Sequence, residues 1–160
     1  MQKITILCIG KLKEGYLRDA CAEYAKRLSR YADFKIVELD EERLPESPSP
    51  AQIASTIRKE GERIISKIPQ GATVVAMCIE GKQHSSEQLA RTLQDYAVGG
   101  GSSVVFVIGG SWGLSDDVKS RASLRLSMSK MTFPHQLARV MLCEQIYRAY
   151  QINSGGKYHK

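Results

Sequence analysis

Three short segments of the chain are almost continuously apolar: Ile4–Ile9, Thr73–Cys78 and Val104–Ile108. Each has the length of a β-strand, and a glycine follows each of them within three residues. A strand that lacks polar alternation must be buried on both faces, which is typical of the inner strands of parallel sheets. These segments therefore predict a sheet that carries a covering layer on each side.

The segments between these strands have helical patterns. Apolar residues recur at three- and four-residue steps between Leu17 and Leu28 and between Ile53 and Ile68, and Ser85 begins a capping box ahead of a helix to about Val98. Phe34–Leu39 and Leu124–Ser127 predict two further strands, a short helix is expected near Ser115, and Asp40–Pro50 reads as a surface loop. We therefore expect residues 1–160 to form one α/β domain, with a mostly parallel sheet and helices on both faces.

The last predicted helix, from Pro134 to about Tyr150, is apolar on most sides. A helix of this kind must be buried against more than one surface. In so small a domain we expect the second surface to belong to another subunit, because closed two-fold dimers are the commonest soluble oligomers. Ile146 and Tyr147 would then lie in the interface.

Charge is concentrated near the end of the chain. Lys and Arg number 23 against 17 Asp and Glu, and eight of the basic residues follow Asp117, where Glu144 is the only acid. Such a distribution favours a polyanionic partner, most commonly a nucleic-acid backbone, over a merely solvated basic face.

No apolar segment approaches the roughly 18 to 20 residues of a membrane span, and no signal peptide is recognisable, so we expect a cytoplasmic protein. The cysteines and histidines lack metal-ligand spacing, so no metal is expected.

Gly109–Gly113 matches the G-x-S-x-G nucleophile elbow and follows a strand, as that motif requires. Ser111, then Asp116 or Asp117, then His135 even complete the order of a serine-hydrolase triad. A chain of 160 residues supplies too few strands for that fold, and both aspartates lie too close to the serine in sequence. We therefore favour a glycine-rich loop whose backbone approaches a ligand closely.

Leu126–Gln136 is the most informative segment. It reads as a loop with exposed backbone amides and apolar side chains, leading into the N-terminus of a helix. That combination suits a flat, apolar heterocycle whose polar edge is bound by main-chain groups.

Several motifs in fixed order resemble the bacterial ribosomal RNA large subunit methyltransferase H family of the SPOUT superfamily. They are Lys3–Lys13, Val107–Leu114, Leu126–Gln136, Arg139-Val140, Glu144–Ala149 and Tyr158–Lys160, so the resemblance covers nearly the whole chain. It implies a homodimer with a deep trefoil knot near the C-terminus, where the knot forms the cofactor site. It also implies methyl transfer from S-adenosylmethionine to N3 of a pseudouridine in 23S rRNA of the assembled 70S ribosome. Trp112 occupies a position that varies in the family, and Lys160 stands where some members have arginine.

The resemblance places the cofactor on Met77, Gly109 and the run Met128, Ser129, Lys130, Met131, Thr132 and Phe133. Because the N3 proton must leave before or during transfer, His135, His159 and Glu144 are candidate bases. Tyr158 suits stacking on a flipped nucleotide, and we expect the tail to order only on substrate. The candidate RNA-binding cations are Arg139, Arg148, Lys157 and Lys160. The alternatives are a non-catalytic ribosome-binding module and the serine hydrolase acting through Ser111.

Overall fold

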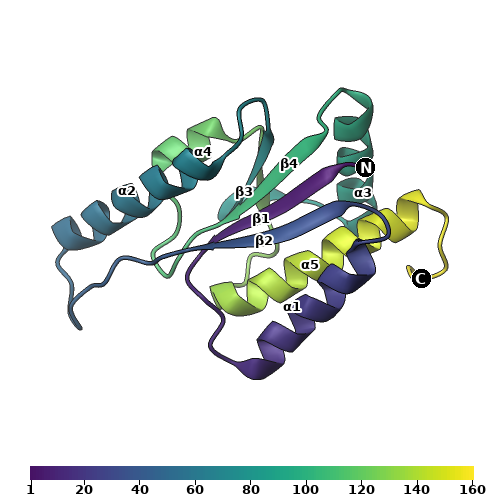
Figure 1. The fold of residues 1–160 in the computed structure, drawn as a ribbon. Coiled ribbons are helices and arrows are strands. Elements are labelled where there is room, and N and C mark those ends of the chain that lie inside the picture. The colour runs from purple at the N-terminus through teal and green to yellow at the C-terminus, as the bar shows by residue number, and fades with distance from the viewer.

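The computed structural model describes residues 1–160 as a five-stranded sheet flanked by five helices (Figure 1). The strand order is β2-β1-β4-β3-β5 and every neighbouring pair is parallel, which confirms the predicted parallel sheet. The elements are, in chain order, β1 (Lys3–Ile9), α1 (Gly15–Leu28), β2 (Asp33–Leu39), α2 (Pro50–Lys67), β3 (Thr73–Gln83), α3 (Ser86–Val98), β4 (Ser103–Ile108), α4 (Asp116–Arg121), β5 (Leu124–Ser127) and α5 (His135–Asn153).

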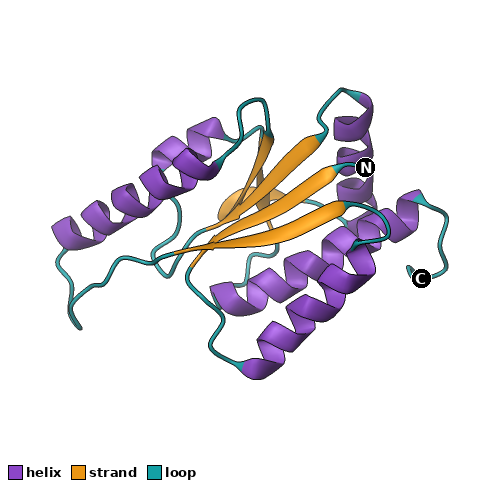
Figure 2. Cartoon of the chain, in the orientation of Figure 1, coloured by secondary structure: helices purple, strands orange, loops and turns teal.

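Helices cover both faces of the sheet: α1, α3 and α5 lie on one side, and α2 and α4 lie on the other (Figure 2). The inner strands alternate between two cores. In β4, Phe106 belongs to the core beneath α1, α3 and α5, whereas Val107 belongs to the core beneath α2 and α4. Three of the four free cysteines are buried in the first core, as small apolar residues should be. The continuous apolar strands are thus explained by burial on both faces.

Strand β3 differs from its prediction. It continues past Cys78 to Gln83, and its pairing with β5 shifts register between Met77 and Lys82. Gly81 lies in this irregular stretch, where an added Cβ would be 2.7 Å from the backbone carbonyl carbon of Arg125. Only glycine permits so close an approach of two strands. Gly81 therefore lies within β3, beyond the end that was predicted at Cys78.

Helix α5 packs against both α1 and α3, which corrects the expectation that a partner subunit must cover its second apolar side. Ile146 has no exposed surface within this chain and lies in the core under α1, α3 and α5. Tyr147 is half-buried among aromatic rings, with its centroid 6.2 Å from Tyr24 and 4.9 Å from Tyr158. An acidic residue at position 146 would therefore disrupt this chain's own core rather than separate two subunits.

Arg139 is buried, although the sequence analysis placed it on an RNA-binding surface. Its side chain is 1% exposed, and its guanidinium donates to Glu38 Oε2 at 2.5 Å and to the Gly10 carbonyl oxygen at 3.0 Å. These contacts join α5 to the ends of β1 and β2. The RNA-binding assignment of Arg139 is therefore wrong, because its guanidinium is buried and pairs with Glu38 inside the fold.

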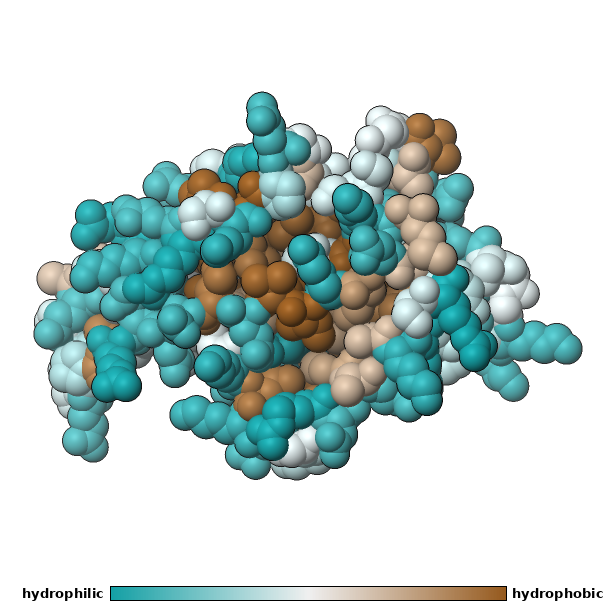
Figure 3. Space-filling view, in the orientation of Figure 1, coloured by the Kyte–Doolittle hydropathy of each residue, from teal (hydrophilic) through white to brown (hydrophobic).

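The edge strand β2 is the least covered strand. Its apolar side chains are only partly buried, and Figure 3 shows hydrophobic side chains gathered at the middle of the face that contains this edge. Hydrophilic side chains surround them.

No helix of the chain has the length and apolar content needed to cross a membrane.

We expect Arg139→Leu to lower the free energy of unfolding by about 2–4 kcal/mol, because it leaves Glu38 without its buried partner. Arg27→Leu is the matched control. Arg27 pairs with Glu23 at an exposed site, and its loss should cost less than about 1 kcal/mol. Urea unfolding of both variants measures the difference, and equal stability of the two would contradict a structural role for Arg139.

Candidate functional site

The carboxyl ends of β3, β4 and β5 border a cavity of about 820 Å³, which we call the large cavity. Ligands of open α/β sheets bind at this edge, and the volume falls within the roughly 300–1,000 Å³ of small-molecule sites. Its wall is formed by residues 77–80, 108–114, 126–129 and 131–135, together with Lys119 and Ala138.

The loop between β5 and α5 leaves most of its backbone polar groups uncommitted. Residues 128–133 form no backbone–backbone hydrogen bond. Two side chains shape the loop instead: the Ser127 hydroxyl donates to the Ser129 carbonyl oxygen at 3.0 Å, and the Met131 amide donates to Ser129 Oγ at 3.0 Å. The remaining amides and carbonyls can bind the polar edge of a ligand, while Met128 and Phe133 offer apolar surface.

The glycine-rich loop after β4 forms the opposite wall of the large cavity. The Gly113 amide donates to the Gly110 carbonyl oxygen at 3.1 Å, and an added Cβ at Gly109 would lie 2.8 Å from the Gly113 carbonyl carbon. Gly109 is therefore required by the tight fold of its own loop.

Ser111 is exposed and forms no hydrogen bond with a histidine or an aspartate, so the structure does not assemble the hydrolase triad.

His135 begins α5 and contributes to the wall of the large cavity. Burial, and secondarily the positive charge of Arg139, lower the pKa of His135 below its ordinary value. The imidazole is consequently neutral at neutral pH, and it can accept or donate one hydrogen bond at the cavity wall.

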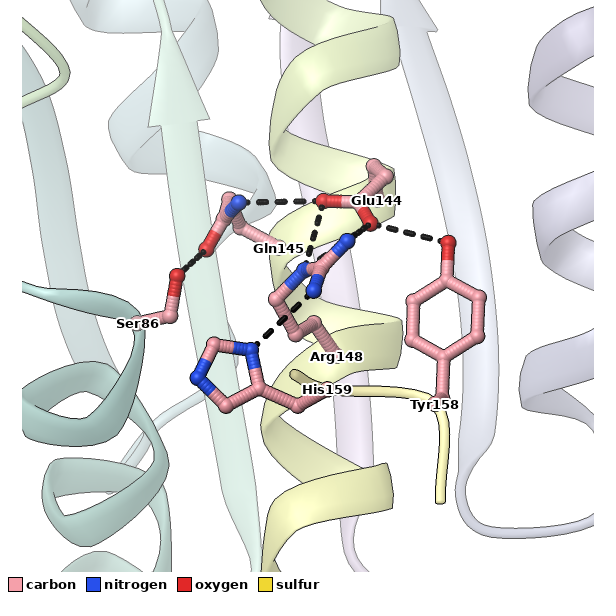
Figure 4. Close-up of polar contacts among 6 residues, drawn as sticks. All are labelled: Ser86, Glu144, Gln145, Arg148, Tyr158 and His159. Atoms are coloured by element: carbon pink, nitrogen blue, oxygen red, sulfur yellow. Dashed lines mark hydrogen bonds and ion pairs between the residues drawn. The ribbon is translucent and has the colours of Figure 1, made fainter. Parts of the chain in front are cut away.

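A second group of predicted residues gathers on the middle of α5, where the C-terminal tail folds back (Figure 4). We call Glu144, Arg148, Tyr158 and His159 the tail cluster. Glu144 Oε1 accepts from Arg148 Nη2 at 2.7 Å and from the Tyr158 hydroxyl at 3.0 Å. Arg148 Nη1 lies 3.0 Å from His159 Nδ1, and His159 Nε2 lies 2.6 Å from Glu87 Oε1. One carboxylate, one guanidinium and two aromatic side chains thus form a connected polar network.

Its neighbours determine the tautomer of His159. Arg148 is a donor only, so His159 Nδ1 must accept the hydrogen bond and carries no proton. The proton is therefore on Nε2, which donates to the Glu87 carboxylate. Both ring nitrogens are committed in this arrangement, so His159 holds Arg148 in place and has no free lone pair.

Tyr158 remains a neutral phenol. Burial and its hydrogen bond to Glu144 raise the pKa of Tyr158 to about 12. Its ring also lies under the Arg148 guanidinium, with the Arg148 Cζ 4.7 Å from the ring centroid. All of these contacts come from this chain, and the expectation that the tail becomes ordered only on substrate stays a prediction.

The structure divides the predicted site residues between two places. Of the eight predicted cofactor residues, all but Lys130 line the large cavity, and Lys130 is exposed on the loop. Of the four predicted catalytic residues, His135 lies at the large cavity and the other three lie in the tail cluster. Along α5, Ala138 at the large cavity and Glu144 in the tail cluster are about 9 Å apart, given a rise of about 1.5 Å per residue. Lys157 and Lys160 are exposed, and Arg148 belongs to the tail cluster.

A second cavity, of about 420 Å³, lies between α5 and the start of α3 and was not predicted from the sequence. Ser86 and Gln145 line it together with Glu144, and Met77 and residues 126–128 separate it from the large cavity. The capping box at Ser85 explained the start of α3 without indicating that the next residue borders a cavity. Gln145 lies in the motif Glu144–Ala149 that carries the family resemblance, but no role was assigned to it, because a glutamine within a helix is ordinarily a surface residue.

Comparisons with known proteins agree with this architecture. A family model described as "Predicted SPOUT methyltransferase" matches residues 2–159. A protein of Clostridioides difficile strain 630 named ribosomal RNA large subunit methyltransferase H is 52% identical over 157 residues, which cover 98% of this chain and 99% of the relative. A protein of the same name from Bifidobacterium adolescentis is 54% identical over 158 residues, with 99% of each chain covered. The structure of a probable methylase family protein from Haemophilus influenzae superposes with a TM-score of 0.56 and 12% sequence identity. The superposition covers 99% of this chain and 71% of that protein, so the two have a similar fold.

The lowered pKa of His135 predicts a pH dependence of stability. The unfolded chain binds this proton more readily than the folded chain, so the contribution of His135 is complete above its unfolded pKa and declines as the pH falls through that value. We expect the free energy of unfolding to fall between about pH 7.5 and about pH 5.5, and to fall less steeply in His135→Gln. Urea unfolding at both pH values measures this. Parallel curves for the two proteins in this range would contradict the assignment.

Proposed function

We propose that this chain, which belongs to the SPOUT methyltransferase family, is a ribosomal RNA large subunit methyltransferase. More specifically, we propose that it transfers a methyl group from S-adenosylmethionine to N3 of a pseudouridine in 23S rRNA of the assembled 70S ribosome, in the cytoplasm. The observation that carries the proposal is the sequence identity of 52–54% with relatives of that name, over alignments that cover 98–99% of this chain. The large cavity at the ligand-binding edge of the sheet supports it.

The large cavity fits the methyl donor chemically. Met128 and Phe133 provide apolar surface for a flat purine, and the uncommitted backbone groups of residues 128–133 suit its polar edge. Lys119 and Glu80, paired at 2.5 Å in the cavity wall, offer both charges to the amino-acid end of the donor. S-adenosylmethionine, when bound, supplies an electrophilic methyl group. The proposal involves no metal.

The tail cluster supplies the acid–base chemistry. The N3–H of pseudouridine is weakly acidic and must lose its proton when the nitrogen attacks the methyl group. Glu144 is the proposed acceptor, because its oxygens only accept hydrogen bonds when ionised and it lines the second cavity. Arg148 keeps this carboxylate oriented and balances its charge, while Tyr158 donates to it as a neutral phenol.

We propose that the active form is a homodimer in which the tail cluster of one subunit faces the large cavity of its partner. No residue of the tail cluster lines the large cavity of its own chain, which supports this arrangement. Three exposed apolar side chains also surround the mouth of the large cavity: Ile79 is 57%, Trp112 48% and Met131 74% exposed. Such a group is typical of a surface that another molecule covers.

We also propose that the chain is knotted near its C-terminus. The crossing would occur between the glycine-rich loop after β4 and the segment between β5 and α5. These two segments form opposite walls of the large cavity. The knot and the methyl-donor site would then be one and the same feature.

Mass mapping of 23S rRNA nucleotides tests the reaction. Ribosomes that lack the modification should gain the mass of one methyl group at a single pseudouridine when incubated with this protein and S-adenosylmethionine. Glu144→Gln should lower kcat by about 100- to 10,000-fold, because it removes the proton acceptor, and should leave donor binding unchanged. Glu62→Gln, at an exposed position on α2, is the control. A wild-type protein with no affinity for S-adenosylmethionine would favour the ribosome-binding module instead.

Mixed dimers test the shared active site. Gly109→Val should inactivate the large cavity by distorting its loop, and Tyr158→Ala with His159→Ala should inactivate the tail cluster. Mixing the two inactive proteins in equal amounts should restore about a quarter of wild-type activity, since half of the dimers are mixed and each mixed dimer has one intact site. A mixture that stays inactive, or an active wild-type monomer in sedimentation, would refute the shared site.

A further inference from the structure

The second cavity has the features of a ligand site, and it is distinct from the large cavity that is proposed to bind the methyl donor. Its volume of about 420 Å³ lies within the range of small-molecule sites, and Leu89, Met128 and Met141 give it apolar walls. His84 Nδ1, in the same wall, is buried and has no hydrogen-bond partner. Because buried polar atoms are rarely left without a partner, this nitrogen points to a ligand with a complementary group.

Gln145 presents one free donor and one free acceptor at this cavity. Its Nε2 donates to Glu144 Oε2 at 3.0 Å, and its Oε1 accepts from the Ser86 hydroxyl at 2.7 Å (Figure 4). An ionised carboxylate only accepts, so Glu144 determines which end of the amide faces it. A primary amide has two N–H donors and two acceptor lone pairs. One of each is therefore unused, side by side on a group whose orientation is fixed from two directions.

We propose that the second cavity binds the unstacked target base and that the Gln145 amide distinguishes pseudouridine from uridine. This inference rests on the function proposed above. Pseudouridine has an N1–H next to its C2 carbonyl, whereas uridine has a C–H at the equivalent position. Gln145 Oε1 accepts the N1–H and Nε2 donates to the C2 oxygen, an edge that uridine matches only in part. N3 adjoins the same carbonyl, which places its proton beside Glu144.

Ser86 has a positioning role in this arrangement. Its hydroxyl, at the first turn of α3, donates to Gln145 Oε1 and so holds the amide in the orientation that Glu144 selects. Glu87, the next residue, binds His159, so the start of α3 anchors both the base-binding amide and the tail cluster. Five hydrogen bonds and the peptide bond between Ser86 and Glu87 thus close a ring through Gln145, Glu144, Arg148 and His159.

The decisive measurement is the ratio of kcat/KM on two ribosome preparations, one with pseudouridine and one with uridine at the target position. We expect the wild-type protein to prefer pseudouridine, and we expect Gln145→Leu to reduce that preference by roughly tenfold, because the N1–H loses its acceptor. Gln145→Leu also removes the hydrogen bond from Gln145 Nε2 to Glu144. That loss slows methyl transfer to both ribosome preparations equally, so it leaves the ratio of the two kcat/KM values unchanged. Gln136→Leu, a glutamine of α5 outside both cavities, is the matched control and should keep the wild-type ratio.

The outcomes separate this inference from the proposed function. A Gln145→Leu protein that methylates ribosomes with the wild-type preference would overturn the role of Gln145 and leave the methyltransferase proposal intact. A wild-type protein that transfers no methyl group to either preparation would overturn both.

A second variant tests the cavity itself, independently of Gln145. Met141→Trp should fill the second cavity from its half-buried wall position. We expect transfer to ribosomes to fall at least tenfold while calorimetry shows unchanged binding of S-adenosylmethionine. Thermal unfolding checks that the variant is folded. Normal transfer by a folded Met141→Trp protein would show that the base binds elsewhere.

Discussion

The buried contact of Arg139 with Glu38 and the Gly10 carbonyl determines where α5 lies, and α5 carries both candidate sites. A guanidinium removed from water needs its charge matched, and the ends of β1 and β2 supply an oxygen each to Nη1 and Nη2, whereas Nε has no partner. The helix is therefore held at its first turns by polar geometry and along the rest of its length by apolar packing. His135 lies one turn before this attachment, and Gln145 and Arg148 lie on the part of the helix that apolar packing holds.

The end of β5 separates two kinds of chemistry. On one side, the large cavity combines apolar surface with uncommitted backbone groups, which suits binding and orienting a cofactor. On the other side, the second cavity and the tail cluster contain a carboxylate, an amide and a guanidinium held by hydrogen bonds, which suits a polar base and a departing proton. Keeping them apart lets each be shaped without disturbing the other, and it makes the approach of a second subunit an essential part of the proposed reaction.

Local patterns predicted most of the fold, because the apolar strands and capping boxes depend on neighbouring residues alone. The sheet order and the extension of β3 to Gln83 depend on contacts with β5, which no local pattern contains. Six of the eight cofactor residues that the resemblance implies form the contiguous run 128–133, so a single loop at a sheet edge brings them together, whereas Met77 and Gly109 join them through the parallel pairing of β3 and β4. Arg139 was misassigned because its charge resembles that of a surface arginine until Glu38, 101 residues away, is brought beside it. Gln145 was missed for the same reason, since Ser86 is 59 residues away.

Trp112 is the only tryptophan in the chain, and its side chain is 48% exposed in the wall of the large cavity. The intrinsic fluorescence of this protein under selective tryptophan excitation therefore comes from a single indole at the candidate cofactor site. A ligand that enters the large cavity would exclude water from that indole and change its emission, whereas a base in the second cavity would not touch it. The protein thus contains a built-in optical reporter that distinguishes occupancy of one cavity from occupancy of the other.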